Sequence, residues 1–460
     1  MMNHTAKTPL FVRDKGFYRN VLRLAIPMTL QSAMGLLLNM MDTVMLGRLG
    51  ENSEAVISAA SLANQPFTIY TLLIFGMASG ASVLISQYWG KQDTDTINSI
   101  TGIVTIISLA AGGLLTTLCY LFAPEIMGLY TSSQTVIDLG VSYLYIVLAS
   151  YPISSMTSLL CSVLRSTEQV KVALVSNSTG IITNILLNYI LIFGKLGFPA
   201  LGIVGAAIAT LISRIVELLM VLFYVIFMEK QIRLSLRKML RIRGVLVRDL
   251  FRYSLPTICS ETLWGLGISC HAAIIGNMGE VAYAAYSVAN IIERIGQLAT
   301  MGFANAALVI IGKEIGAGRE HNAYPYAKTL LALATLLGAL MSGVVVLLAR
   351  PAVSLFNVVD ATKDTAVNII FVIAVMVFIK SFNATAIVGV FRGGGDTVTA
   401  MLMDSVCMWT ISVPMGLLAA YVLELPVWWV YAFLMSDEVV KIFIGFWRVA
   451  SRKWIRNVTR

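Results

Sequence analysis

The chain alternates between long apolar stretches and short polar ones. About 20 consecutive apolar residues, each adding 1.5 Å of helix, span the hydrocarbon core of a bilayer. The pattern therefore predicts an all-α polytopic membrane protein with twelve transmembrane helices. The apolar blocks that carry this prediction lie near 20–46, 57–89, 97–123, 135–162, 170–194, 202–228, 249–275, 282–312, 324–349, 365–391, 397–422 and 426–447.

The second half of the chain repeats landmarks of the first half in the same order. Pro27 recurs as Pro256, 229 residues later, and Arg165 recurs as Arg392, 227 residues later. Because each half holds an even number of spans, the two halves form a parallel pseudo-two-fold repeat with a cleft between them, which is typical of transporters. We predict a cytoplasmic N-terminal segment (1–19), an N-lobe of six helices (20–228), a basic cytoplasmic linker (229–248), a C-lobe of six helices (249–450) and a cytoplasmic tail (451–460).

Composition and charge support a membrane protein and set its orientation. Hydrophobic residues make up 58% of the chain and charged residues only 12%, too few to cover a soluble protein of this size. The net charge of +9 does not predict nucleic-acid binding, because the basic residues sit in short stretches between apolar blocks. Of the 33 lysines and arginines, 25 fall on the side of the termini and four on the opposite side. This bias predicts cytoplasmic termini. We expect insertion in the plasma (inner) membrane.

Several other classes of protein lack support in the sequence. The five cysteines show no C-x-x-C spacing and the three histidines are scattered, so no zinc site is expected. A phosphate-binding loop with its lysine is missing, which argues against ATP as the energy source. We find no clustered catalytic set either, and therefore expect neither an enzyme nor a cofactor, only a coupling ion.

Polar side chains inside the first-half blocks predict an ion site. A carboxylate at bilayer depth is costly and therefore presumed functional, which applies to Asp42. Asn39 lies three residues earlier on the same helical face, and Asn184 and Asn188 are four residues apart on one face of the fifth span. A carboxylate with amide oxygens could hold a proton or a small hard cation such as sodium. Hydrogen bonding between helices is the alternative role for the two amides of the fifth span.

The second half carries different polar chemistry in its apolar blocks. Glu261 and Trp264 open the region equivalent to the first span, and His271 occupies the repeat position of Asp42. These three residues are candidates for binding substrate or a second proton, since aromatic faces also attract organic cations. Lys380 and Asp404 also fall within apolar blocks and could form an ion pair.

Longer motifs make the chain similar to a known family. The motifs are Pro27, Asp42-Thr-Val-Met-Leu-Gly47, Asn184-Ile-Leu-Leu-Asn188-Tyr-Ile-Leu-Ile-Phe-Gly194, Leu255-Pro256, Glu261, Gly276-Asn-Met-Gly279 and Arg392-Gly-Gly-Gly-Asp-Thr397. Together they resemble the multidrug and toxic compound extrusion (MATE) family over nearly the whole chain. The resemblance implies a twelve-helix, two-lobed antiporter that expels organic cations, often drugs or dyes, in exchange for protons or sodium.

The resemblance also implies roles for single residues. Asp42 matches the N-lobe aspartate of the family's cation site, and Asn184 matches an asparagine of that site. Asn188 stands where many relatives carry aspartate, which leaves proton or sodium coupling open. Glu261 resembles the acidic residue of the seventh helix in many members, whereas Lys380 lies near the place where some members have an acidic residue in the tenth helix.

The function predicted from the sequence is therefore export of amphipathic, mostly cationic organic compounds by a monomer in the lipid bilayer. Asp42, Asn39, Asn184 and Asn188 would bind the coupling cation, with sodium a candidate metal. The alternatives are an exporter of one specific metabolite and a flippase of lipid-linked precursors, which needs a strongly basic cleft. A membrane-embedded enzyme and a channel are the rivals from other classes.

Overall fold

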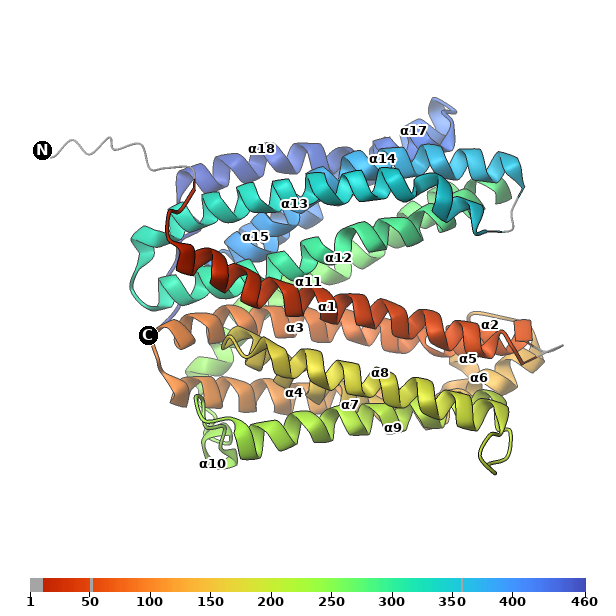
Figure 1. Ribbon diagram of the computed structural model, residues 1–460, viewed down its shortest axis with the longest axis horizontal. Helices are drawn as coiled ribbons and strands as arrows, with labels where there is room; N and C mark the ends of the chain where they lie inside the picture. The colour runs from red at the N-terminus through yellow and green to blue at the C-terminus, as the bar shows by residue number, and fades with distance from the viewer. Residues whose placement is uncertain (1–10, 50–52, 357–358) are drawn as a thin grey trace, which may run out of the picture. The chain divides into compact units, whose positions relative to one another are not determined.

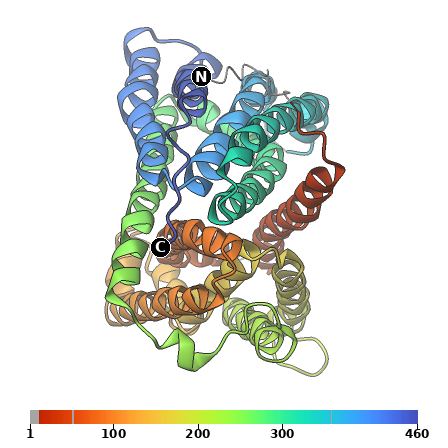
Figure 2. The same cartoon turned by 90° about the vertical axis from the view of Figure 1, so that its left-hand side faces the viewer.

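A computed structural model describes residues 11–49, 53–356 and 359–460, apart from the side chains of residues 38–40. All regular structure within these residues is helical, as predicted, and the helices of each part run roughly parallel to one another (Figures 1 and 2). The helices of the first half are α1 (Lys15–Leu46), α2 (Ser53–Ala63), α3 (Gln65–Gly90), α4 (Thr94–Leu121), α5 (Ala123–Gly128), α6 (Gln134–Val147), α7 (Ser150–Ser166), α8 (Val170–Phe193), α9 (Gly202–Phe223) and α10 (Leu236–Met239). Those of the second half are α11 (Gly244–Gly276), α12 (Glu280–Gly316), α13 (Glu320–Ser354), α14 (Asp360–Ala384), α15 (Thr397–Cys407), α16 (Val413–Leu417), α17 (Val427–Leu434) and α18 (Ser436–Ser451).

The membrane-spanning segments follow the predicted apolar blocks. Among the described residues, ten helical segments are long and apolar enough to cross a bilayer, and α6 with α7, bent by 51°, makes an eleventh. These correspond to the first eleven predicted blocks. The twelfth block, 426–447, forms α17 and α18, which are separated at Met435. Each of these two helices is too short to cross a bilayer alone, and the block contains the charged residues Asp437, Glu438 and Lys441.

The chain divides into two compact units. The unit that we call the N-unit contains Leu30–Ala81 and Thr94–Phe251, and the C-unit contains Arg252–Arg460, Ser82–Asp93 and the residues up to Thr29. In the N-unit α8 packs on α9, and α4 packs on α7. In the C-unit α12, α13 and α14 pack on one another around a buried aliphatic core. The predicted lobe boundaries at 228 and 249 stay predictions.

A close helix contact in the C-unit depends on two glycines. Gly312 and Gly316, four residues apart on α12, face Ser86 and Gln87 on the final turns of α3. A β-carbon on Gly316 would overlap the backbone carbonyl of Gln87. Small residues at this spacing let two membrane helices approach until their backbones touch. Residues from the first half of the chain are thereby held firmly against the second half.

The C-terminal segment, residues 452–460, is built into this same contact. The Gln87 side-chain amide donates to the Arg456 carbonyl at 3.1 Å and accepts from the Val458 N–H at 2.8 Å. The Arg456 N–H donates to the Gly394 carbonyl at 2.8 Å, and Trp454 is fully buried. Figure 1 shows the C-terminus beside the end of α3. The segment predicted as a cytoplasmic tail therefore packs against the end of α3 and the segment that follows Arg392.

The helices of the second half contain three π-helical segments, at Thr385–Arg392, Met408–Ser412 and Leu418–Val422. A π-helical turn carries an extra residue in the helix, which turns neighbouring side chains inward and is frequent at functional sites. The first two of these segments contribute side chains to a cavity in the C-unit that is described below.

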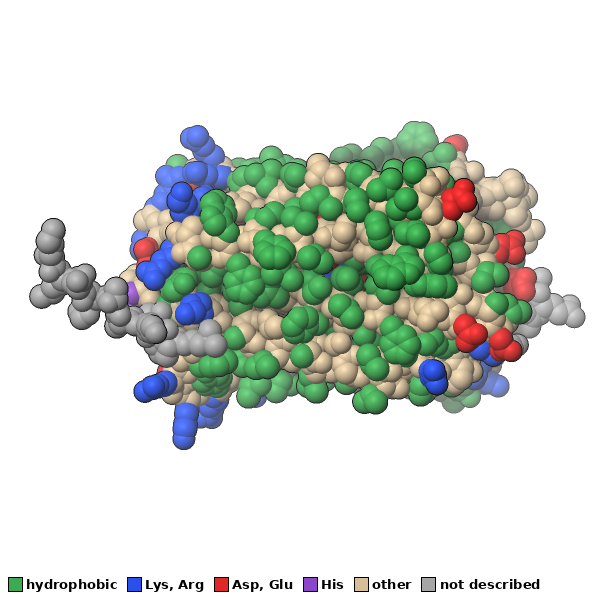
Figure 3. All heavy atoms as spheres, turned by 90° about the horizontal axis from the view of Figure 1, so that it is seen from above, with side chains coloured by type: hydrophobic (Ala, Val, Ile, Leu, Met, Phe, Trp, Pro, Cys, Tyr) green, Lys and Arg blue, Asp and Glu red, His purple; other side chains and the backbone are tan. Residues whose placement is uncertain are grey.

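The surface fits a lipid environment. Figure 3 shows hydrophobic side chains over the middle of one face, with Lys and Arg side chains gathered at one end and Asp and Glu side chains at the other. Large exposed hydrophobic residues such as Leu347, Phe371 and Phe443 cover the helices of the C-unit. In water so large an apolar surface would drive aggregation, whereas in a bilayer it is the expected lipid contact. The protein is therefore an integral membrane protein.

Candidate functional site

Three residues predicted from the sequence meet in the N-unit. The Asn188 side-chain amide on α8 donates to Asp42 Oδ1 on α1 at 2.7 Å and to Asn184 Oδ1 at 2.9 Å. The four-residue spacing places both asparagines on one face of α8, so a single N–H₂ group can bridge the carboxylate and the second amide. The Asn184 amide in turn points to the Thr210 hydroxyl on α9 at 3.5 Å.

The arrangement leaves one strong acceptor without a hydrogen bond. Asn188 is fully buried, and its Oδ1 atom has no partner among the described residues. Buried carbonyl oxygens are nearly always satisfied, so an exception calls for an explanation. Rotation of the Asn188 amide by half a turn would bring this oxygen toward Asp42 and Asn184, and the three residues would then present only oxygen atoms.

Such a set of oxygens suits a small hard cation or a proton. Carboxylate and amide oxygens are the usual ligands of hard cations, whereas the described residues contain no group of three or more His, Cys, Asp or Glu side chains that could hold a metal. The predicted fourth member, Asn39, lies outside the described side chains. On α9, Arg214 and Glu217 form an ion pair at 3.0 Å. We interpret this pair as structural.

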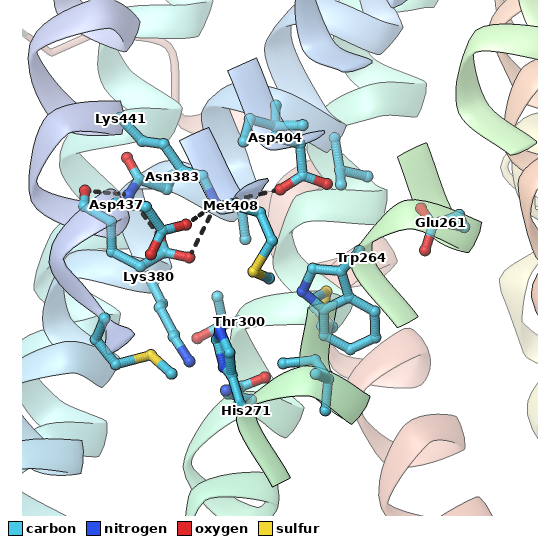
Figure 4. Close-up of a pocket in the computed structure, with 18 of the residues that line it drawn as sticks. Glu261, Trp264, His271, Thr300, Lys380, Asn383, Asp404, Met408, Asp437 and Lys441 are labelled. Carbon is cyan, nitrogen blue, oxygen red and sulfur yellow. Dashed lines mark hydrogen bonds and ion pairs between the residues drawn. The ribbon is translucent and has the colours of Figure 1, made fainter. Parts of the chain in front are cut away.

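The predicted residues of the second half line one cavity in the C-unit. Its volume is about 130 Å³. Figure 4 shows the labelled side chains converging on it from several helices, among them Glu261, Trp264 and His271 from α11 and Lys380 from α14. Asp404, Asn383 and Met408 complete much of the wall.

Charged side chains in and beside this cavity form three groups. Glu261 pairs with the buried Arg392 at 2.8 Å. Lys380 pairs with Glu293 at 2.6 Å. A third group centres on Lys441, and its members are given below. The ion pair between Lys380 and Asp404 that the sequence suggested is not formed in the described residues, because each of the two side chains has a different partner.

Lys441 on α18 is surrounded by three carboxylates. Its ammonium group lies 2.8 Å from Asp437, 3.3 Å from Glu438 and 3.3 Å from Asp404. The lysine side chain is 1% exposed and the Asp437 side chain 3%. Asp404 also accepts a hydrogen bond from the Ser260 hydroxyl at 2.9 Å.

His271 makes a single hydrogen bond, with its Nε2 atom 2.7 Å from the Ser412 hydroxyl. It is buried, and its Nδ1 atom has no partner among the described residues. His271 therefore does not pair with a carboxylate, although it occupies the repeat position of Asp42.

The sequence interpretation missed part of this site. Glu293 lies within a predicted span, so the rule that drew attention to Asp42 also applies to it. Lys441 lies four residues after Asp437 and three after Glu438, a visible sign of a charged helix face. Arg392 is buried in the π-helical segment that continues α14, and no sequence pattern indicated that extension.

Comparison with known proteins gives a consistent family. Residues 27–190 and 257–436 match the MatE family model, one match in each half of the chain. The chain is 22% identical to a protein of Thermotoga maritima named "Probable multidrug resistance protein NorM", over 95% of this chain and 93% of that protein. It is 23% identical to "Probable multidrug resistance protein YoeA" of Bacillus subtilis, over 99% of both chains.

Solved structures share the fold. A crystal structure of a MATE protein in a bent conformation superposes with a TM-score of 0.85 at 21% identity, covering 95% of this chain and 96% of that one. A transporter of the MOP superfamily from Pyrococcus furiosus, described as having a binding pocket of reverse polarity, superposes with a TM-score of 0.84 at 21% identity over 98% of this chain and all of that one. The predicted all-α, twelve-helix, two-lobed layout agrees with these folds and is confirmed.

Proposed function

This chain belongs to the MatE family of membrane transporters, and from that premise we propose that it exports small organic cations, drugs and dyes among them, in exchange for a proton or a sodium ion. The multidrug resistance names of its relatives support the substrate class. The Asp42–Asn184–Asn188 group would bind the coupling ion. The C-unit cavity would bind the organic cation.

One observation carries the coupling role. The Asn188 N–H₂ group bridges Asp42 and Asn184 while its own carbonyl oxygen is buried without a hydrogen bond. The amide hydrogens thus occupy the place that a cation would take between the two acceptors. Entry of a cation would turn the Asn188 amide around, so that its carbonyl oxygen contacts the cation. The cation would then take the place of the amide hydrogens between Asp42 and Asn184. On this proposal the site would alternate between two arrangements, one bridged by the amide and one by the cation, as exchange requires.

The membrane potential can drive this exchange. Moving one positive charge inward across 100 mV releases about 2.3 kcal/mol. Since every 1.4 kcal/mol corresponds to a tenfold concentration ratio, that energy sustains a gradient of roughly 40-fold for a neutral substrate. A singly charged substrate leaving the cell in exchange for one coupling ion would cancel this term completely, so its export requires a chemical gradient of the coupling ion or entry of a second ion.

The proposal also includes the membrane in which the protein lies, its orientation and its oligomeric state. The excess of Lys and Arg on the side of the termini supports cytoplasmic ends in the plasma (inner) membrane. We propose that the transporter acts as a monomer. A flippase of lipid-linked precursors has less support, because the basic residues of the cavity wall, Lys380, Arg392 and Lys441, are each paired with carboxylates.

The test is transport by purified protein in vesicles with proton and sodium gradients imposed separately. Wild-type protein should move ethidium against its gradient under one of the two gradients. Asp42→Asn should abolish that dependence, because a neutral amide cannot exchange a cation or proton. Asp138→Asn, an exposed carboxylate of the same unit on α6, is the matched control. Ion-driven transport that survives Asp42→Asn at normal protein levels would overturn the coupling role.

A further inference from the structure

The cavity of the C-unit offers a ligand hydrogen-bond acceptors. The Ser412 hydroxyl uses its single hydrogen to donate to the Leu434 carbonyl. It must therefore accept its second hydrogen bond, which comes from His271 Nε2. In a neutral imidazole the other ring nitrogen then carries a lone pair and no hydrogen. His271 Nδ1 is thus an acceptor, and it has no partner in the described part of the chain.

Asn383 provides a second acceptor of the same kind. Its amide hydrogens are taken by Glu438, one by the backbone carbonyl at 2.8 Å and one by the side-chain carboxylate at 2.7 Å. That leaves Oδ1 as an acceptor, again without a partner among the described residues. Asn383 and His271 are each 2% exposed, and both line the cavity (Figure 4). Two buried acceptors suit a ligand that supplies N–H or O–H groups.

The charges of the same wall favour a cation. Glu261 is balanced by Arg392, and Glu293 by Lys380. Lys441 is the single cation shared by Asp404, Asp437 and Glu438. With all three carboxylates ionised, the group around Lys441 carries two more negative charges than positive ones, in a region sheltered from water where unbalanced charge is costly.

We propose that this cavity binds small primary alkylammonium ions, and that a short diamine carrying two positive charges fits it best. This deepens the proposed function by naming a substrate class, and it rests on that function. Each ammonium group brings three N–H donors, which suit His271 Nδ1, Asn383 Oδ1 and the carboxylate oxygens. Two charges match the excess around Lys441. Since a cavity of 150 Å³ holds benzene, a cavity of about 130 Å³ suits a ligand of roughly six non-hydrogen atoms, the size of 1,4-diaminobutane. Trp264 supplies an aromatic face beside the ligand.

A ligand series on wild-type protein tests the proposal directly. Binding of 1,4-diaminobutane, n-butylammonium and butyltrimethylammonium is measured by calorimetric titration of the purified full chain in detergent. n-Butylammonium and butyltrimethylammonium share chain length and charge, but only n-butylammonium has N–H donors. We expect diaminobutane to bind at least ~10-fold more tightly than butylammonium, and butylammonium at least ~10-fold more tightly than its trimethylated counterpart. Equal binding of the methylated and unmethylated ions would overturn the role of the acceptors.

Variants separate the charge from the donors. Asp437→Asn removes one of the two excess charges, so diaminobutane should lose most of its advantage over butylammonium. Asp364→Asn, an exposed carboxylate on α14, should leave the order unchanged. An unaltered advantage in folded Asp437→Asn protein would overturn the charge argument.

The same titration on Asp42→Asn protein distinguishes this inference from the proposed function. The variant keeps the C-unit cavity, so the order of affinities should persist in it. If vesicles containing wild-type protein show no ion-driven export while the order of affinities holds, the antiport proposal fails and the ligand class stands. If export is intact but the trimethylated ion binds as well as the others, the ligand class fails and the antiport proposal stands.

Discussion

Removing Lys380 while keeping Glu293 should destabilise the C-unit strongly. The Glu293 carboxylate accepts hydrogen bonds from Lys380 at 2.6 Å, Gln297 at 2.8 Å and Tyr431 at 2.8 Å. The side chains of Lys380 and Glu293 are only 17% and 10% exposed. Breaking a buried ion pair from one side costs about 3–5 kcal/mol, because the remaining charge is left unbalanced. Two neutral donors still reach Glu293, so we expect Lys380→Met to cost about 3 kcal/mol, at the low end of that range.

A double variant separates the effect of the unbalanced carboxylate from the loss of lysine packing. In Lys380→Met with Glu293→Gln no charge is left, and the new amide oxygen can still accept from Tyr431. The double variant should therefore lose only about 1 kcal/mol and be more stable than Lys380→Met alone. The free energy of unfolding is measured by SDS titration in detergent micelles. Lys363→Met serves as control, because its pair with the exposed Asp360 should contribute less than about 0.5 kcal/mol.

The result that refutes this account is a double variant no more stable than Lys380→Met. The cost would then come from lost packing of the lysine side chain and not from an uncompensated carboxylate. The pair would in that case be a poor guide to the electrostatics of the cavity wall.

Three further predictions concern packing and coupling. Gly316→Ala should lower the melting temperature, because the added carbon overlaps the Gln87 carbonyl. Gly343→Ala is the control and should leave the melting temperature unchanged, because the space around Gly343 is open. Equal effects of the two substitutions would contradict the close helix contact. Trp454→Ala should cost about 3 kcal/mol in an unfolding titration, since the side chain is fully buried, and an unchanged midpoint would show that the segment does not pack in solution. Asn188→Asp should lower the half-saturating concentration of the coupling cation at least ~10-fold in vesicle transport, because a second carboxylate joins Asp42; an unchanged value would exclude Asn188 from the site.

The sequence predicted the fold well because membrane helices are determined by their own apolar length. Each of the first eleven blocks contains a helix or a bent helix pair in the expected place. Backbone groups in lipid must bond within their own helix, so local composition decides the element without reference to distant residues. The first-half site was predictable for a similar reason, since Asn184 and Asn188 share a face through helical periodicity alone.

The second-half cavity was predicted only in part, because its pairs join distant helices. Glu293 reaches Lys380 across 87 positions of sequence and Tyr431 across 138. Several acids compete for each base there, and which pairs form depends on helix rotation and on the π-helical turn before Arg392. Spacing along one helix contains no information about either.

The C-terminal segment has a consequence for the order in which the protein is made. Asp396 is buried, and its partners are Arg448 at 2.5 Å and Arg456 at 3.1 Å. Every group that the segment contacts, including Gln87 on α3, leaves the ribosome before the segment does. Synthesis proceeds at about 5–20 residues per second, so α3 is made roughly 20–70 seconds before Trp454. The contact between the end of α3 and this segment therefore forms only after the helices of the C-unit up to α18 have been made.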